Sequence, residues 1–284
     1  MPDSGFRIAR ILVALDHSDD SRTTLAEAAA LAARLQAELV GLFIEDVKLL
    51  DAAQLPFVRQ ISLTGHSAPM DRTGVERGFR AQEQAARQLM ESVALRHRLS
   101  WSFRVARGRA SVEILAQAQG VDLVIVGKTA PAVTRQGRIG ATALAIADAL
   151  RGAILFSEPR AAHVLGYGGA ILAVYDDGAA ADRVLAIAAR LSDAGGQSLV
   201  VVSPGDAAQR QLLRQRAGDR LAVLGVTARF IGVTSHGAAA LDEALVQAGG
   251  GLVVIGEHAP MLGGQPLADL LSYLRAPMLV VAAD

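Results

Sequence analysis

Two short glycine-containing segments have the composition of a phosphate-binding loop. VGKTAP at 126–131 and IGEHAP at 255–260 each follow an apolar run, and each has a glycine, two further residues and then Ala-Pro. Glycine at the end of a buried strand lets backbone N–H groups approach a phosphate closely, because no Cβ stands in the way. The shared spacing has two interpretations. Either both segments form a phosphate-binding loop, or both are altered remains of such a loop.

Alternating strands and helices would position the first of these segments. Continuous apolar runs predict strands buried on both faces, and apolar residues at helical spacing predict helices between them. The predicted strands are 10–15, 38–45, 101–107, 121–127 and 152–157, and the predicted helices are 19–36, 77–97, 111–119 and 141–149. This alternation predicts a parallel sheet with right-handed crossovers.

The same order of elements recurs in the second part of the chain. ARILVALDH matches GAILAVYDD, so that Asp16 corresponds to Asp176 at an offset of 160 positions. The fourth strands match at an offset of only 129, so the first repeat carries 31 extra residues, which we assign to an insertion at 46–77. The predicted fold is α/β, with two tandem doubly wound domains whose five parallel strands follow the order 3-2-1-4-5. The predicted boundaries are 1–157 for the first domain, 158–168 for the linker and 169–284 for the second domain.

This strand order predicts where a ligand binds. In an open parallel sheet the crevice lies beyond the carboxyl ends of the strands where the order reverses, here between the first and fourth strands. Asp16 ends the first strand and Gly127 ends the fourth. A carboxylate there can accept hydrogen bonds from a ribose or a base. The alternative is that Asp16 caps the helix that follows it, because aspartate is common at that position.

The first repeat resembles the universal stress protein family. Its opening strand, turn and helix read ILVALDHSDDSRTTLAEAAALA, in which Asp16, Ser18 and Ser21 match the family's Asp-x-Ser-x-x-Ser turn. The family's signature segment corresponds to GVDLVIVGKTAPAVTRQGRIGAT. The resemblance covers both repeats and implies the adenine-nucleotide α-hydrolase-like fold. It also implies that 152–157 and 277–282 pack together as an intramolecular pseudo-dimer, with a homodimer of the whole chain left open.

The signature of the family's nucleotide-binding members, Gly-x2-Gly-x9-Gly-Ser/Thr, is only partly present. Gly127 and Gly140 match its first and third glycines, whereas Ala130 stands for the second glycine, Ala141 stands for Ser/Thr, and Thr142 follows one position later. The resemblance therefore implies ATP or a related adenine nucleotide in the first repeat, bound by a modified site. The residues that it implies are Asp16, Val40, Gly127, Lys128, Gly140, Ala141 and Thr142, with Val40 as a backbone contact beside the adenine.

The Ala-Pro pair changes the chemistry of the loop. Ala130 adds a Cβ, and Pro131 restricts the residue before it to extended backbone. A left-handed turn at Ala130 is disfavoured by about 1–2 kcal/mol for the Cβ alone. The standard phosphate-binding loop is therefore excluded, and a modified one would use the cations of Lys128, Arg135 and Arg138. The alternative is that these cations are only solvated.

The second repeat departs further from the nucleotide-binding pattern. Asp269 stands where the third glycine is expected, and Gly178 and Ala181 replace the two serines of the turn. Glu257 replaces Lys128 and would repel a phosphate. We expect no nucleotide in the second repeat, which would act as a structural partner of the first.

The composition excludes several classes of function. Lys+Arg 28 equal Asp+Glu 28, so no net charge attracts nucleic acid or a membrane surface. Cysteine is absent and the six histidines show no ligand spacing, so no metal site is expected. No serine has a positioned histidine, so no catalytic residues and no enzyme activity are expected. No apolar run precedes a signal-peptide cleavage site, and none is long enough to span a bilayer. We therefore expect a cytoplasmic protein.

The leading interpretation is a non-catalytic stress-response or signalling module with an adenine nucleotide in its first repeat. One alternative is a ligand-free scaffold that binds an unidentified protein partner through the 46–77 insertion. Another is a slow, metal-assisted ATP hydrolase that uses Asp16. The insertion carries apolar residues at 49–58 that need burial, which predicts a lid with its apolar part packed over the first crevice. An exposed partner-binding surface is the alternative.

Overall fold

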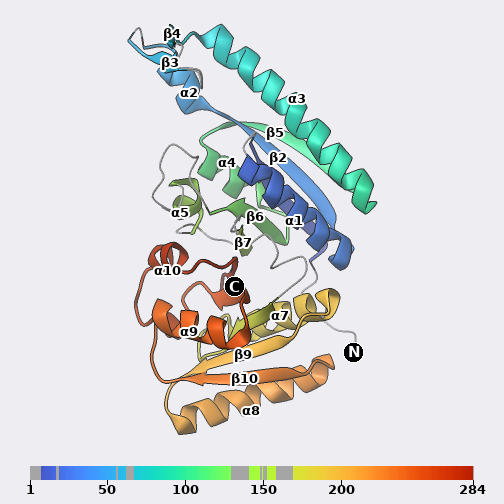
Figure 1. Ribbon diagram of the computed structural model, residues 1–284, viewed down its shortest axis with the longest axis vertical. Coiled ribbons are helices and arrows are strands. Elements are labelled where there is room, and N and C mark those ends of the chain that lie inside the picture. Colours follow the sequence, from blue (N-terminus) through green and yellow to red (C-terminus); the bar gives the residue numbers. More distant parts are fainter. Residues whose placement is uncertain are drawn as a thin grey trace.

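One mixed sheet of ten strands runs through the described part of both halves of the chain (Figure 1). In this computed structural model the described residues are 8–16, 19–55, 57–61, 67–128, 141–147, 149, 152–157 and 169–283. The strands of the first half in this sheet are β1 (Arg10–Leu15), β2 (Glu38–Asp46), β5 (Trp101–Gly108), β6 (Leu123–Gly127) and β7 (Ala153–Ser157). Those of the second half are β8 (Ala170–Val174), β9 (Leu199–Pro204), β10 (Ala228–Val233), β11 (Gly251–Gly256) and β12 (Met278–Val281).

Helices connect these strands. The first half contains α1 (Asp19–Leu35), α2 (Val47–Ala52), α3 (Arg72–His97), α4 (Ala110–Gln117) and α5 (Ala141–Ala147). The second half contains α7 (Ala181–Gly195), α8 (Ala207–Leu224), α9 (Ala238–Ala248), the short 3-10 helix η2 (Pro260–Leu262) and α10 (Leu267–Tyr273). Among the described helices, none is both long and apolar enough to cross a membrane.

The strand order in each half is the predicted one. The first half follows β5-β2-β1-β6-β7 and the second follows β10-β9-β8-β11-β12, with every neighbouring pair inside a half parallel. The order 3-2-1-4-5 therefore occurs twice, and the predicted fold class is confirmed.

The two halves join through their fifth strands. β7 and β12 are antiparallel neighbours, with Phe156 opposite Met278. The expected pairing of 152–157 with 277–282 is therefore present, and each half covers the sheet edge of the other. The predicted linker at 158–168 lies outside the described residues, so the domain boundaries stay a prediction.

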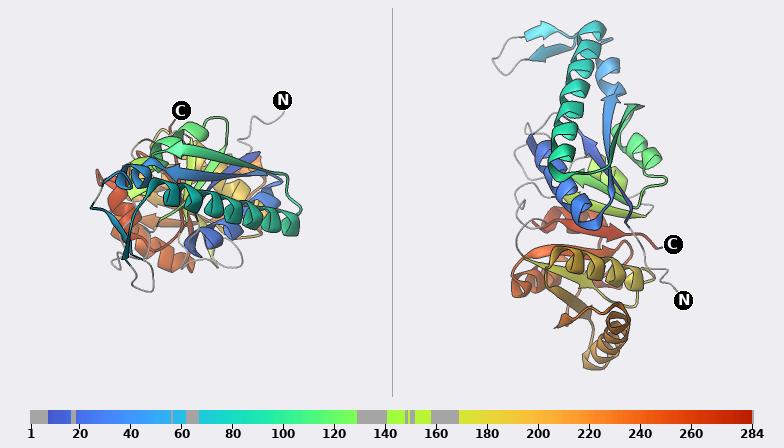
Figure 2. Two further views of the ribbon diagram at one scale, coloured as in Figure 1. Left: turned by 90° about the horizontal axis from the view of Figure 1, so that it is seen from above. Right: turned by 90° about the vertical axis from the view of Figure 1, so that its right-hand side faces the viewer.

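Helices cover both faces of the sheet (Figure 2). One face packs against α1, α3, α7 and α8, and the other against α4, α5, α9 and α10. Along β1, Ile11 and Val13 belong to the first of these cores, whereas Leu12 between them belongs to the second. Burial on both faces explains why the strands read as continuous apolar runs.

Helix α3 begins five residues earlier than the predicted start at 77. Asp71 caps it, because the carboxylate Oδ1 accepts a hydrogen bond from the backbone N–H of Gly74 at 2.7 Å. Two glycines in the first turns, Gly74 and Gly78, lower the helix propensity there. The periodic pattern therefore begins only after them, and the sequence prediction missed the first turns.

The internal repeat extends to single side-chain contacts. The guanidinium of Arg87 on α3 lies 4.6 Å from the centre of the Phe103 ring on β5. Arg214 on α8 lies 5.1 Å from the Phe230 ring on β10 in the same way. Both residues of the second pair follow their counterparts by 127 positions. The extra residues of the first half therefore precede Arg87, and include α2 and the first turns of α3.

The insertion forms an arm that projects beyond the end of β2 (Figures 1 and 2). The arm consists of α2, the hairpin of β3 (Arg59–Ile61) and β4 (Ser67–Pro69), and the first turns of α3. It packs against α3 through α2, and both Leu50 and Phe79 are buried there. The arm thus has a small apolar contact of its own.

The expected lid with a packed apolar part is wrong. Leu49 and Leu55 are exposed, and Phe57 is 75% exposed. The helix α2 has only six residues, and Leu50 is its only buried side chain, so the helix is too short to bury the other apolar residues of the segment. The expected polar part of the lid was 64–74, and its residues 64–66 lie outside the described residues.

Candidate functional site

The first crevice lies where β1 and β6 end side by side. The two strands are parallel neighbours, with Val13 opposite Ile125, so Asp16 and Gly127 follow the carboxyl ends of adjacent strands. The Asp16 side chain is exposed, and its backbone N–H donates a hydrogen bond to Ser21 Oγ at 3.0 Å. The structure therefore brings these two sequence-predicted residues to one edge of the sheet, and the turn serine holds the turn between β1 and α1.

Val40 does not lie at this crevice. It is fully buried inside β2, opposite Leu12 of β1 on one side and Ser102 of β5 on the other. The register places Phe43 opposite Leu15, so Ile44 is level with Asp16. Ile44, and not Val40, therefore lies level with Asp16 at this crevice. The sequence pattern placed Val40 there because it does not give the register between two strands.

Lys128 is also placed differently from the expectation. Its side chain is only 2% exposed, and its ammonium donates hydrogen bonds to the carbonyl oxygens of Leu274 at 2.9 Å and Ala276 at 2.8 Å. Both carbonyls belong to the second half, between α10 and β12. The expected contact of Lys128 with phosphate is therefore corrected to a contact between the two halves.

Most of the predicted loop falls outside the described residues. This applies to 129–140, and so to Ala130, Pro131 and Gly140. After this segment, α5 begins at Ala141, and Thr142 in its first turn is half-buried. The structure thus places the two flanks of the loop, at Lys128 and at α5, but not the loop itself.

Buried polar groups lie beside Gly127, and the sequence analysis missed them. The Thr24 hydroxyl is 1% exposed and has no hydrogen-bond partner among the described residues, and a Cβ built at Gly127 would lie 3.8 Å from it. The buried Ser157 hydroxyl donates to the carboxylate of Glu27 at 2.5 Å. In the second half the positions matching Thr24 and Glu27 are both apolar. Polar residues on the buried face of the first helix were the signal that could have found them.

The second crevice is closed by its own loop. Asp176 is 5% exposed, and its carboxylate accepts the backbone N–H of Gly178 at 3.0 Å and that of Met261 at 3.1 Å. Burial is the main cause that raises the pKa of Asp176. Through Met261, the carboxylate fixes η2, which begins at Pro260. The Ala-Pro pair of the second repeat therefore starts a short helix and does not form a phosphate-binding loop.

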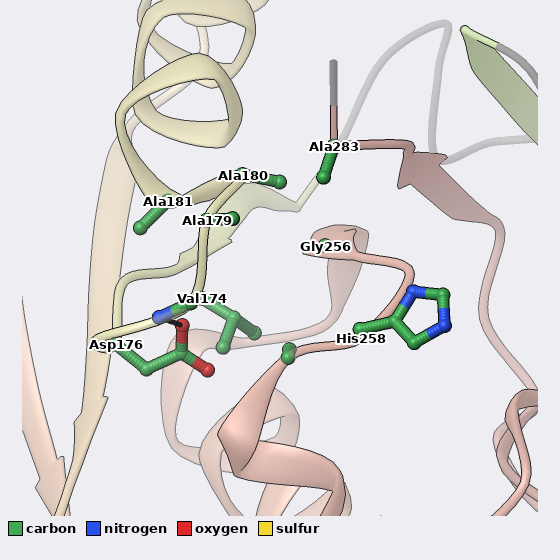
Figure 3. A pocket seen from close by; sticks show the side chains of 10 residues that line it. Val174, Asp176, Ala179, Ala180, Ala181, Gly256, His258 and Ala283 are labelled. Atoms are coloured by element: carbon green, nitrogen blue, oxygen red, sulfur yellow. Dashed lines mark hydrogen bonds between the residues drawn. The ribbon is translucent and has the colours of Figure 1, made fainter.

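Little space is left between β8 and β11. A Cβ at Gly178 would lie 3.0 Å from Cδ of Pro260, and one at Gly256 would lie 3.2 Å from Cβ of Ala180. The remaining cavity, with Asp176 on one side and His258 on the other, measures about 20 Å³ (Figure 3). This is room for about one water molecule, whereas small-molecule sites occupy roughly 300–1,000 Å³.

Replacing Asp176 with asparagine tests the burial of this carboxylate. Since the folded-state pKa is raised above the unfolded value, the native state binds the proton more tightly. The wild type should therefore lose stability relative to Asp176→Asn as the pH rises from about 3 through the raised pKa. Urea unfolding of both proteins at several pH values measures this difference. A difference that grows in favour of the wild type with rising pH would contradict the assignment.

A wider groove lies beyond the carboxyl end of β8, and its two arginines pair with aspartates that also line it. It measures about 500 Å³ and is lined by residues 175–179, which follow β8, and by residues of α7 and α8. Arg220 binds Asp182 at 2.7 Å, and the Tyr175 hydroxyl donates to Asp182 at 2.9 Å. Burial and this carboxylate raise the pKa of Tyr175 to about 12. Within the described ranges, no three His, Asp or Glu side chains gather as they would to hold a metal ion.

Comparison with known proteins identifies the fold. The chain superimposes on a universal stress protein from Archaeoglobus fulgidus DSM 4304 with a TM-score of 0.70 and 13% identity, over 98% of this chain and 97% of that one. A putative universal stress protein from Pseudomonas aeruginosa UCBPP-PA14 matches with a TM-score of 0.61 and 17% identity, over 99% and 96%.

A similar fold also occurs as one domain of a transport protein. The cytoplasmic domain of a prokaryotic cation chloride cotransporter matches with a TM-score of 0.50 and 12% identity, over 97% of this chain and 96% of that one. No family model and no curated protein matches the sequence. Over its full length, the chain therefore has the universal stress protein fold, present twice in tandem.

Proposed function

We propose that the chain is a non-catalytic, universal-stress-type module that binds one adenine nucleotide in its first half. The difference between the two crevices carries this proposal. In the first half the Asp16 side chain is exposed at the carboxyl edge of the sheet, and polar groups lie beside Gly127. In the second half the equivalent carboxylate, Asp176, is buried against its own loop.

The proposed site uses residues from both edges of the first crevice. Asp16 accepts hydrogen bonds from the ribose or the base, and the backbone of Ile44 lies beside the adenine. Gly127, Gly140, Ala141 and Thr142 surround the phosphates, of which Gly140 is assigned from the sequence alone.

Nucleotide analysis of the purified and then denatured protein tests the proposal. We expect an adenine nucleotide in the extract, or saturation at one ATP per chain when the emptied protein is titrated calorimetrically. An empty extract together with no heat of ATP binding would contradict the proposed function.

Restoring the family's loop should strengthen binding. Replacing Ala130 with glycine and Pro131 with arginine removes the Cβ and the proline restriction and adds a cation. The Cβ alone disfavours a left-handed turn by about 1–2 kcal/mol, and each 1.4 kcal/mol corresponds to about a tenfold change in Kd. We therefore expect about tenfold tighter ATP binding by calorimetry. An unchanged Kd would mean that another departure, such as Ala141, controls the site.

The exposed arm favours a second candidate function, a scaffold for a protein partner. Leu49, Leu55 and Phe57 are exposed apolar side chains on one projecting segment. Such residues commonly mark interaction surfaces when they are contiguous. This candidate would take the place of the first if the protein neither carries nor binds a nucleotide. Nothing in the described residues supports the metal-assisted hydrolase, because they contain no metal-ligand cluster.

A further inference from the structure

The residue that precedes the predicted loop is anchored in the other half of the chain. The Lys128 ammonium donates to the carbonyls of Leu274 and Ala276, in the segment between α10 and β12. The backbone N–H of Lys128 also donates to the carbonyl of Ser157 at 2.9 Å, which aligns it with the end of β7.

The residues that follow the predicted loop contact the same helix. α5, which begins at Ala141, packs against α10. Ala143 and Ile146 of α5 belong to the same buried apolar cluster as Leu270 and Leu271 of α10. Lys128 and α5 therefore both contact the second half, Lys128 just after α10 and α5 at α10 itself.

The segment before α10 is held in place by the closed second crevice. Asp176 binds the N–H of Met261 in η2, and the carbonyl of Met261 accepts the N–H of Gly237 at 2.7 Å. The side chain of Gln265, just before α10, accepts the N–H of Ala238 at 3.2 Å. The closed loop thus ties the region before α10 to β8 and to the start of α9.

Among the described residues, the second half shows no equivalent lysine anchor to the first half. Glu257 occupies the position that matches Lys128, since its N–H donates to the carbonyl of Val281 at 2.9 Å as that of Lys128 does to Ser157. A carboxylate has no proton to donate at neutral pH and cannot bind carbonyl oxygens as an ammonium does. Glu257 therefore cannot form the reverse of the contact that Lys128 makes.

We propose that Lys128 is a positioning residue, through which the segment between α10 and β12 of the second half holds Gly127 and α5 at the first-half nucleotide site and sets the ATP affinity of that site. The inference rests on the proposed function, because it concerns the same site. It assigns the closed second crevice a role as a support for the first.

The test compares Lys128→Met with a control variant in another part of the chain that is expected to lower the free energy of unfolding by a similar amount. Methionine keeps the length of the side chain and removes the ammonium. The control is Leu221→Ala, a buried position on α8 that is remote from α10. ATP affinity is measured by calorimetry, and amide hydrogen exchange of α5 is measured by mass spectrometry without nucleotide. We expect at least tenfold weaker ATP binding and faster exchange in α5 for Lys128→Met, and neither change for Leu221→Ala.

The outcomes separate the inference from the proposed function. Equal ATP affinity for the wild type and Lys128→Met would overturn the inference and leave the proposed function standing. Equal losses in Lys128→Met and Leu221→Ala would also overturn it, since the effect would then follow stability alone. If the wild type binds no ATP, the proposed function fails, and unchanged exchange in α5 would further refute the anchoring by Lys128.

Discussion

Replacing Phe156 with alanine is expected to lower the free energy of unfolding by about 3–5 kcal/mol. Phe156 is fully buried on β7, opposite Met278 of β12, where the two halves join. The truncation leaves a cavity at this junction, and the surrounding strands can relax only partially because they are paired on both sides. Urea unfolding followed by circular dichroism measures the loss.

Phe230→Ala provides a matched control. Phe230 is only half-buried on the edge strand β10, where its ring packs beneath Arg214. Because less apolar surface is lost and the edge can relax, we expect a loss of less than about 2 kcal/mol. Equal losses for the two phenylalanines would show that the β7–β12 junction is not a principal source of stability.

Replacing Asp16 with alanine is expected to weaken ATP binding by about 10–100-fold. Hydrogen bonds to a charged group contribute about 1.5–3 kcal/mol each, and each 1.4 kcal/mol is a tenfold change in Kd. The exposed carboxylate lies at the carboxyl edge of the sheet, level with Ile44, where the ribose or base is proposed to bind. Calorimetric titration of ATP into both proteins measures the change.

Asp177→Ala serves as the control for Asp16→Ala. Asp177 is an exposed aspartate at the corresponding edge of the second half. Its replacement changes the net charge of the chain by the same amount, so a general electrostatic effect would appear in both variants. We expect its ATP affinity to equal that of the wild type, and a similar loss in both variants would argue against a site at Asp16.

The architecture follows from the sequence because its signals are local and repeated. Strands buried on both faces read as apolar runs, and the match of Asp16 with Asp176 shows that the order of elements occurs twice. The antiparallel pairing of β7 with β12 then agrees with the resemblance to a family of paired domains. These features depend on short segments, and the residues within each segment are enough to predict whether it forms a strand or a helix.

The site was predicted less completely because its contacts are distant in sequence. Lys128 stands between glycine and threonine, a setting typical of phosphate binding, but its partners at Leu274 and Ala276 lie almost 150 positions away. Val40 was misplaced because a strand pattern gives no register. Phe57 was expected to be packed, since an apolar run does not show whether a neighbouring element covers it.

The most direct measurement is a crystal structure of the chain with ATP. The account predicts a nucleotide in the first half, with the ribose or base at Asp16 and the phosphates beyond Gly127, and an unchanged loop over Asp176. A nucleotide between the ends of β8 and β11, with the first crevice empty, would contradict the account.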